Sequence, residues 1–102
     1  AQVHLFWVRE KTQSSAEVDL LCVYKQWVIP VEVKSGSTGS LRSLHQFIDA
    51  AYHPFAIRIY GGKLRLEEAR TPAGKPYVLL NLPYYLGTTL PDYAAWLVEE
   101  NK

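Results

Sequence analysis

The 102-residue sequence contains one cysteine, Cys22, and no methionine. A single cysteine excludes an internal disulfide, and the simpler interpretation is a protein of the reducing cytoplasm. The chain has no apolar run of about 18 residues and no secretory signal, so we expect no membrane span. Because it begins at Ala1 and lacks methionine, we expect it to be a fragment of a longer protein.

Charge and composition leave the partner open but favour a folded domain. The formal net charge is +1, which neither requires nor excludes nucleic acid, because a binding face can be basic on a nearly neutral protein. Apolar residues make up 48% and aromatic residues 13% of the chain, values typical of a globular protein. The length predicts a single domain over residues 1–102, with enough chain to bury one core.

Hydrophobic periodicity predicts a sheet with helices packed on it. Strands are expected at residues 3–10, 16–24, 27–34, 55–60, 63–68 and 77–82. A helix is expected across 40–51, where apolar residues recur at helical spacing and the stretch from Ser37 to Ser40 offers N-cap candidates. A second helix is expected from Pro91 to about Glu99. The predicted class is therefore α/β or α+β.

The segment 16–34 predicts a tight antiparallel hairpin around Lys25 and Gln26. If the strands pair symmetrically about this link, the numbers of opposed residues sum to 51. One face then contains only apolar pairs, namely Val18–Val33, Leu20–Val31, Cys22–Ile29 and Tyr24–Trp27. A slip of one residue would destroy this segregation, so the pattern itself supports the register.

The other face of the hairpin brings chemically active residues together. It pairs Glu17 with Lys34 and Asp19 with Glu32, and directly opposed Cβ atoms lie about 5 Å apart. A divalent cation between the two carboxylates would turn their repulsion into attraction, and Mg²⁺ suits one or two carboxylates with waters and a phosphate oxygen. The backbone carbonyl of Val33 is a further candidate ligand, and Glu17 is an accessory acidic group. Lys34 is placed to orient a water or to stabilise charge that develops on a phosphate.

A simpler interpretation of this face is the wet side of a half-exposed strand pair. Glu17 and Lys34 would then form a surface ion pair of little energetic value. Apolar residues farther along the face indicate that something covers it there, namely Leu21, Val23, Val28 and Pro30. The carboxylates are therefore expected at the edge of a covered region, which is a better place for a site than an open surface.

Several segments together resemble a known family. EVD at 17–19, EVKSG at 32–36 and the helix that follows resemble the restriction-endonuclease-like PD-(D/E)xK fold. More narrowly, FWVRE, AEVDLL, IPVEVKSG, SLRSLHQF and NLPYYLG are similar to the C-terminal domain of unknown function attached to many prokaryotic AAA-type ATPases. The resemblance covers nearly the whole chain and implies a mixed central sheet flanked by helices. It also implies an upstream ATPase domain, since the chain has no GxxxxGK[ST] phosphate-binding motif.

The resemblance implies that Asp19 and Glu32 hold Mg²⁺ or Mn²⁺ and that Lys34 is the catalytic lysine. Gln46 matches an occasional accessory glutamine of related nucleases, although Ala50 stands where a tyrosine usually accompanies it. Three functions follow as alternatives. The first is metal-dependent hydrolysis of DNA, and the second is a catalytically silent nuclease-fold module that binds DNA or protein beside an ATPase domain. The third is a structural or dimerisation domain.

Other residues have a functional and a structural interpretation side by side. Five basic residues form either a DNA-backbone surface or scattered solvated charge, namely Arg58, Lys63, Arg65, Arg70 and Lys75. The stretch 35–40 either presents backbone N–H groups to a phosphate or is a simple connection, which we favour. The three histidines lack zinc spacing, and the three tryptophans are expected in a core or interface. Tyr84 and Tyr85 suit an oligomer or interdomain contact.

Overall fold

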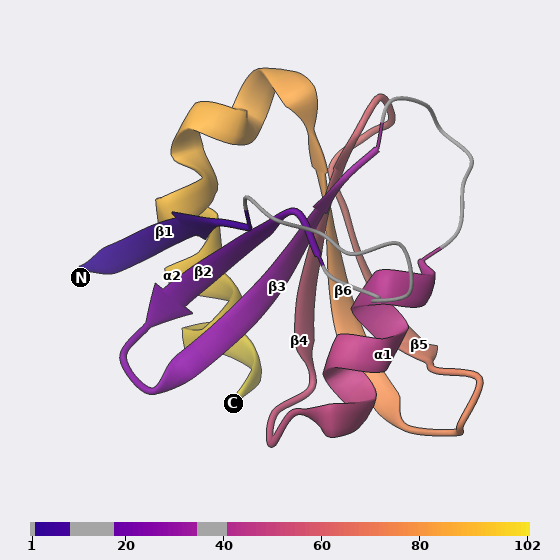
Figure 1. Ribbon diagram of the computed structural model, residues 1–102. Coiled ribbons are helices and arrows are strands. Elements are labelled where there is room, and N and C mark those ends of the chain that lie inside the picture. Colours follow the sequence, from indigo (N-terminus) through magenta and orange to yellow (C-terminus); the bar gives the residue numbers. More distant parts are fainter. Residues whose placement is uncertain (1, 9–17, 35–40) are drawn as a thin grey trace.

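Six strands and three helical segments make up the part of the chain that the computed structural model describes, residues 2–8, 18–34 and 41–102. The elements are β1 (Val3–Trp7), β2 (Leu20–Tyr24), β3 (Trp27–Val33), α1 (Arg42–Ala50), β4 (Phe55–Tyr60), β5 (Arg65–Arg70), β6 (Pro76–Pro83), the 3₁₀ helix η1 (Tyr84–Thr89) and α2 (Leu90–Asn101). The strands form one sheet in the order β1-β2-β3-β4-β6-β5, with α1 on one face and α2 on the other (Figure 1). This architecture confirms the predicted α/β class.

The sheet is mixed in strand direction. β3, β4 and β6 run parallel to one another in its centre. β1 and β2 on one side, and β5 on the other, are antiparallel to their neighbours. Parallel neighbours need a crossover connection, and α1 lies in the one between β3 and β4. The carboxyl ends of the three parallel strands therefore meet at one edge of the sheet, which is where open α/β sheets bind ligands.

Most predicted elements are found, with shifts that have local causes. β4 has the predicted bounds, whereas β5 begins two residues later than predicted. The turn before it is longer, because the Tyr60 hydroxyl donates to the carbonyl of Lys63, at 2.7 Å, and holds the chain in the turn. The 3₁₀ helix η1 was not predicted. The predicted strand ends at 9–10 and 16–17 lie outside the described residues.

The two α-helices begin without a side-chain cap. Leu41 is the N-cap residue of α1, so the prediction that a residue from Ser37 to Ser40 caps this helix was wrong. α2 begins with Pro91 in its first turn, as expected for a residue that lacks an N–H group. Within the described ranges, no helix is both long and apolar enough to cross a membrane.

The β2–β3 hairpin confirms the predicted register. Leu20 lies opposite Val31 and Tyr24 lies opposite Trp27, so paired residue numbers sum to 51. The link contains Lys25 with a φ of 54°, a left-handed conformation that is uncommon outside glycine. The Lys25 ammonium lies 3.0 Å from the carboxylate of Glu99 on α2. A tertiary contact therefore supports a turn that local propensity disfavours.

Val18 departs from the predicted pairing. Sequence alternation places it opposite Val33, on the same face as Leu20. In the structure the chain bends at Asp19 before β2 starts, and Val18 packs into the cluster under α1 instead. Val33 is 37% exposed. The prediction was wrong at this pair because strict alternation of faces holds only within a continuous strand.

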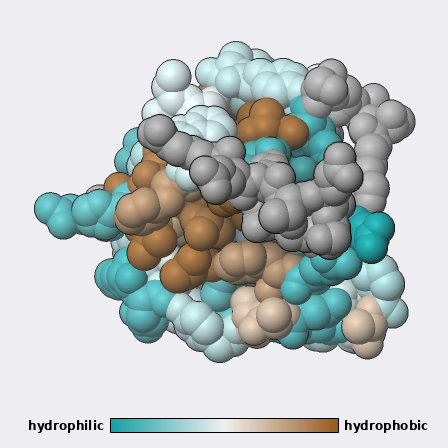
Figure 2. All heavy atoms as spheres, in the orientation of Figure 1, coloured by the Kyte–Doolittle hydropathy of each residue, from teal (hydrophilic) through white to brown (hydrophobic). Residues whose placement is uncertain are grey.

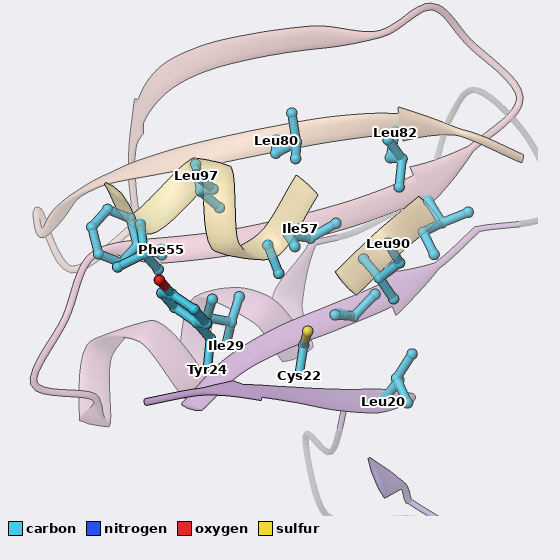
Figure 3. Packing of buried hydrophobic residues seen from close by; sticks show 14 residues of the cluster. Leu20, Cys22, Tyr24, Ile29, Phe55, Ile57, Leu80, Leu82, Leu90 and Leu97 are labelled. Carbon is cyan, nitrogen blue, oxygen red and sulfur yellow. The ribbon is translucent and has the colours of Figure 1, made fainter. Parts of the chain in front are cut away.

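Two apolar clusters, one on each face of the sheet, hold the helices. The larger joins the sheet to α2 and includes Leu20, Cys22, Tyr24, Ile29, Phe55, Ile57, Leu80, Leu82, Leu90 and Leu97 (Figure 3). The smaller lies under α1, where the buried Leu44 and Ile48 confirm the predicted apolar stripe of that helix. Burial raises the pKa of the Cys22 thiol to about 12, so it remains a neutral core side chain.

The C-terminal end of α1 is closed by a side chain from far along the sequence. The ammonium of Lys75 donates to the backbone carbonyls of Ile48 and Ala51, both at 2.6 Å, and lies 3.3 Å from that of His53. The last carbonyls of a helix have no partner within it and carry partial negative charge. Lys75 therefore fixes the end of α1 against the loop that precedes β6.

Lys75→Met should lower the free energy of unfolding by about 1–2 kcal/mol, since the stem is kept and the charged donor is lost. Urea denaturation measures this change. Lys63→Met, at an exposed position, is the matched control and should leave the stability unchanged. Equal effects of the two substitutions would contradict a capping role.

His53 is buried between β3 and β4 as a neutral ring. Its Nδ1 accepts the backbone N–H of Phe55 at 3.0 Å, so its Nε2 carries the proton and donates to the carbonyl of Val28. Only 2% of the residue is exposed. Burial lowers the pKa of His53 below its ordinary value, and this effect outweighs the opposing one of the Val28 hydrogen bond. Burial likewise lowers the pKa of His45.

Stability should fall as the pH drops through the ordinary pKa of histidine, about 6.5. The unfolded chain takes up protons there that the folded one, with its lowered pKa values at His53 and His45, does not. Urea unfolding at a series of pH values between neutral and mildly acidic measures the loss. His4→Gln, at an exposed position, should leave this pH dependence intact. A flat profile for the wild-type chain would contradict the buried neutral state of His53.

Candidate metal and nucleic-acid site

The candidate site lies where β2 begins and β3 ends. The β2–β3 pairing ends at Leu20 and Val31, and Asp19 follows as a bend whose side chain contacts the backbone of Val33, next to Glu32. The backbone N–H of Lys34 donates to the carbonyl of Ile59 at 2.8 Å, so β3 stays paired with β4 to its end. Asp19, Glu32 and Lys34 are thereby brought together near the carboxyl ends of the parallel strands.

Asp19 is held by backbone contacts on both of its sides. Its carboxylate Oδ2 accepts the backbone N–H of Val33 at 2.9 Å, and its own carbonyl accepts the N–H of Val8 at 3.0 Å. The side chain of Asp19 therefore takes the place of a further β2–β3 ladder bond. The bend in the chain at this residue gives the carboxylate access to β3.

Glu32, in β3, and Lys34, directly after β3, form an ion pair. The ammonium of Lys34 lies 3.4 Å from Oε1 of Glu32, with side-chain exposures of 22% and 11% respectively. A carboxylate this deep needs compensating charge, because transfer of an unpaired charge from water is costly. Lys34 supplies this charge from the same face of β3, two residues along the strand.

The peptide between Val33 and Lys34 orients a further oxygen. All described peptide bonds are trans, so the carbonyl of Val33 points opposite to the N–H of Lys34. That N–H points to β4. The Val33 carbonyl therefore points away from β4, toward the side where Asp19 lies.

The donor set has the chemistry of a hard-cation site of low ligand number. Mg²⁺ is commonly bound through one or two carboxylates while it keeps several waters, and Asp19, Glu32 and the Val33 carbonyl offer such oxygens. Across residues 2–8, 18–34 and 41–102, no three or more histidine, cysteine or acidic side chains gather as a metal cluster. Glu17, the predicted accessory acid, lies outside the described residues.

A row of polar side chains continues from Glu32 across the sheet. Glu32 lies beside Arg58 of β4, Arg58 beside Asn81 of β6, and Asn81 beside Arg65 of β5, each as direct neighbours in register. We call Glu32, Arg58, Asn81 and Arg65 the polar row. Direct neighbours point to the same face, and this is the face that carries α1. The row therefore runs beside the apolar cluster under α1.

Sequence reasoning found only part of this row. Arg58 was included among the basic residues without a particular role, and Asn81 was not singled out. Asn81 has no exposed surface, and its Oδ1 accepts the Nε–H of Arg58 at 2.8 Å. Its Nδ2 donates to Oε1 of Glu67 at 3.1 Å and to the carbonyl of Arg65 at 3.3 Å. The available signal was one asparagine within the otherwise apolar run YVLLNLP.

The remaining predicted basic and accessory residues are dispersed. Lys75 caps α1, Arg70 donates to the carbonyl of Gly74 at 3.1 Å, and Arg65 pairs with Glu67 at 3.3 Å. Of these, Arg65 lies in the polar row with Arg58, whereas Lys75 and Arg70 each bond backbone carbonyls elsewhere. Gln46 is exposed on α1, as predicted, and lines a hollow of about 490 Å³ with Leu41, Arg42, His45, Asp49, Pro72 and Ala73. The stretch 35–40 lies outside the described residues.

Asp19→Ala should lower the free energy of unfolding by about 1 kcal/mol, because the N–H of Val33 loses a charged acceptor at a partly solvated position. Asp19→Asn keeps an oxygen acceptor and should retain most of the stability. Urea denaturation of both variants measures the difference. Equal losses would show that the hydrogen bond to Val33 does not hold the start of β2.

The family model for a domain of unknown function, DUF4143, matches residues 1–85 of the chain. No curated protein and no solved structure matches it significantly. The matched range includes all the strands, α1, and every residue of the candidate site. The chain therefore belongs to the DUF4143 family.

Proposed function

We propose that this chain is a nuclease-type domain that hydrolyses phosphodiester bonds of DNA with the help of Mg²⁺ or Mn²⁺. The observation that supports the proposal is that Asp19, bonded to the backbone of Val33, and the Glu32–Lys34 ion pair gather where β3 ends beside β4. The EVD and EVKSG segments and their resemblance to PD-(D/E)xK nucleases support the same assignment.

Asp19, Glu32 and the carbonyl of Val33 would hold the metal ion. When bound, such an ion polarises a phosphate oxygen and acidifies a water, which supplies the nucleophile of a hydrolysis. The hydrogen bond from Val33 N–H keeps one oxygen of Asp19 on the β3 side. Fixing the ligand before the ion arrives reduces the loss of side-chain freedom on binding.

Lys34 would interact with the phosphate of the substrate rather than with the metal ion. In the structure its ammonium is within 3.4 Å of Glu32, so the strand already delivers a cation beside the carboxylate. A fixed positive charge stabilises negative charge that develops on the phosphoryl oxygens during displacement. Its partial burial strengthens this interaction relative to that of a fully solvated lysine.

The test is incubation of the chain with plasmid and single-stranded DNA in Mg²⁺ or Mn²⁺. Glu32→Gln should lower the cleavage rate at least a hundredfold, since even supporting groups of metal sites contribute about 10–100-fold. EDTA should abolish cleavage. Glu100→Gln, which removes an exposed carboxylate of α2, is the matched control and should cleave at the wild-type rate.

Circular dichroism of Glu32→Gln establishes whether the variant is folded. Cleavage that persists in EDTA or in Glu32→Gln would rule out this site as its source. Absence of cleavage by the folded wild-type chain under all these conditions would overturn the hydrolytic proposal for the chain.

A second candidate is a catalytically silent nuclease-fold module that binds a protein beside an AAA-type ATPase domain. Edge strand β1 exposes Leu5, Phe6 and Trp7 by 43%, 55% and 63%. Phe6 is paired with Leu21, which packs toward the α1 cluster, and Figure 2 shows apolar surface over this part of the sheet. Exposed apolar groups on an edge strand are typical of protein contacts. Partner binding that survives Glu32→Gln would favour this function.

A further inference from the structure

We propose that Arg58 is a phosphate-binding residue of the same site, with a guanidinium that the sheet holds in place for the backbone of a nucleic acid. This inference rests on the proposed function for its substrate class. It depends on the position of Arg58 beside Glu32 and on two contacts that fix its side chain, one with Asn81 and one with Tyr60.

Arg58 lies close to the candidate site. Arg58 lies next to Glu32 in the parallel β3–β4 pairing, and neighbouring strands are about 4.8 Å apart. A phosphate that approaches Glu32 and Lys34 therefore comes within reach of the Arg58 side chain as well. Arg58 and Lys34 would contribute two positive charges around a group whose own charge is negative.

A fully buried amide anchors the guanidinium on one side. Asn81 Oδ1 accepts the Nε–H of Arg58 at 2.8 Å, and Asn81 Nδ2 is committed to Glu67 and to the carbonyl of Arg65. These contacts determine which end of the amide faces Arg58, because only its oxygen can accept a hydrogen bond. The amide therefore has no freedom to turn away from the arginine.

The aromatic ring of Tyr60 packs against the guanidinium of Arg58. Arg58 Cζ lies 4.7 Å from the centroid of the Tyr60 ring, within the range of a cation–π contact. The Tyr60 hydroxyl is tied to the carbonyl of Lys63 at 2.7 Å. A Cβ atom at Gly62 would come within 2.5 Å of the ring carbon Cζ, so a glycine at 62 leaves the ring its place.

The terminal N–H groups of Arg58 remain as hydrogen-bond donors for a ligand. Arginine has five N–H donors, and Asn81 takes the one on Nε. Among the described residues, none accepts a hydrogen bond from the two terminal nitrogens of Arg58, and the residue is half-buried rather than enclosed. A planar pair of N–H groups matches two oxygens of a phosphate, which a lysine cannot do.

The contacts of Arg58 differ from those of an arginine with a purely structural role. An arginine that served only packing would have its terminal nitrogens paired with nearby acids, as Arg65 does with Glu67. Arg58 is instead held at Nε by a neutral amide, which leaves its positive charge uncompensated by that partner. Such an arrangement orients the cation and preserves its attraction for an anion.

The test is binding of a labelled DNA oligonucleotide, single-stranded and duplex, by fluorescence anisotropy in EDTA, so that no metal-dependent cleavage occurs. Arg58→Gln should weaken binding about tenfold, as expected for loss of a charge-assisted hydrogen-bonded pair. The slope of log affinity against log salt should become shallower by about 0.9 for duplex and about 0.7 for single-stranded DNA, the value for one phosphate contact. Arg58→Lys should keep the slope and still lose affinity.

Arg70→Gln is the matched control, since it removes the same charge from an exposed position near the end of β5. It should leave both affinity and salt slope close to wild type. Thermal unfolding of each variant tests its fold, and Arg58→Lys, which keeps the stem and charge, remains informative if Arg58→Gln is unstable. Inorganic phosphate is titrated in parallel, and competition by phosphate as strong as that by DNA would assign a free-phosphate source to the same chemistry.

The outcomes separate this inference from the hydrolytic proposal. Weakened binding in Arg58→Gln with no cleavage by wild type supports Arg58 and removes the nuclease activity. Cleavage by wild type with unchanged binding in Arg58→Gln supports the activity and overturns the role of Arg58. A wild-type chain that binds neither DNA nor phosphate, or an Arg70→Gln effect equal to that of Arg58→Gln, also overturns it.

Discussion

Pairing of β3 with two different neighbours is the constraint on which the rest of the structure depends. On one side it is joined to β2 by a two-residue link and runs antiparallel to it. On the other it runs parallel to β4 across a helical crossover. The first pairing brings Asp19 to the backbone of Val33, and the second sets Glu32 beside Arg58. A shift of one residue in either would turn the polar face of β3 into the core.

The charged groups lie where the sheet can accommodate them at low cost. Glu32 is only 8% exposed, yet Lys34 is close to it on the same strand and Arg58 is its neighbour on the next. Burial of a carboxylate is tolerable when positive charge is near, and removal of one partner is what destabilises such a group. Members of the two apolar clusters are sequence neighbours of the site residues, namely Val31 and Ile59 on one face and Val18 on the other. The site is therefore bordered by buried apolar side chains.

Asn81 shows how a buried polar side chain can organise a surface. It has no exposed surface, and its three hydrogen bonds reach Arg58, Glu67 and the backbone of β5. A fully bonded buried amide has few alternative arrangements, because any rotation leaves donors or acceptors unpaired. The side-chain position of Arg58 is therefore set in part by the pairing of β5 with β6, at the opposite side of the sheet from Asp19.

Local pattern by itself determined the hairpin register and the apolar stripe of α1, since each follows from alternation or helical spacing over a short stretch. Tertiary structure alone decided the place of Val18, the cap that Lys75 forms on α1 and the polar row through Arg58 and Asn81. These depend on contacts between residues distant in the sequence or on a bend that interrupts a strand. Periodicity identifies the face on which a side chain lies, whereas strand order decides which side chains become neighbours on that face.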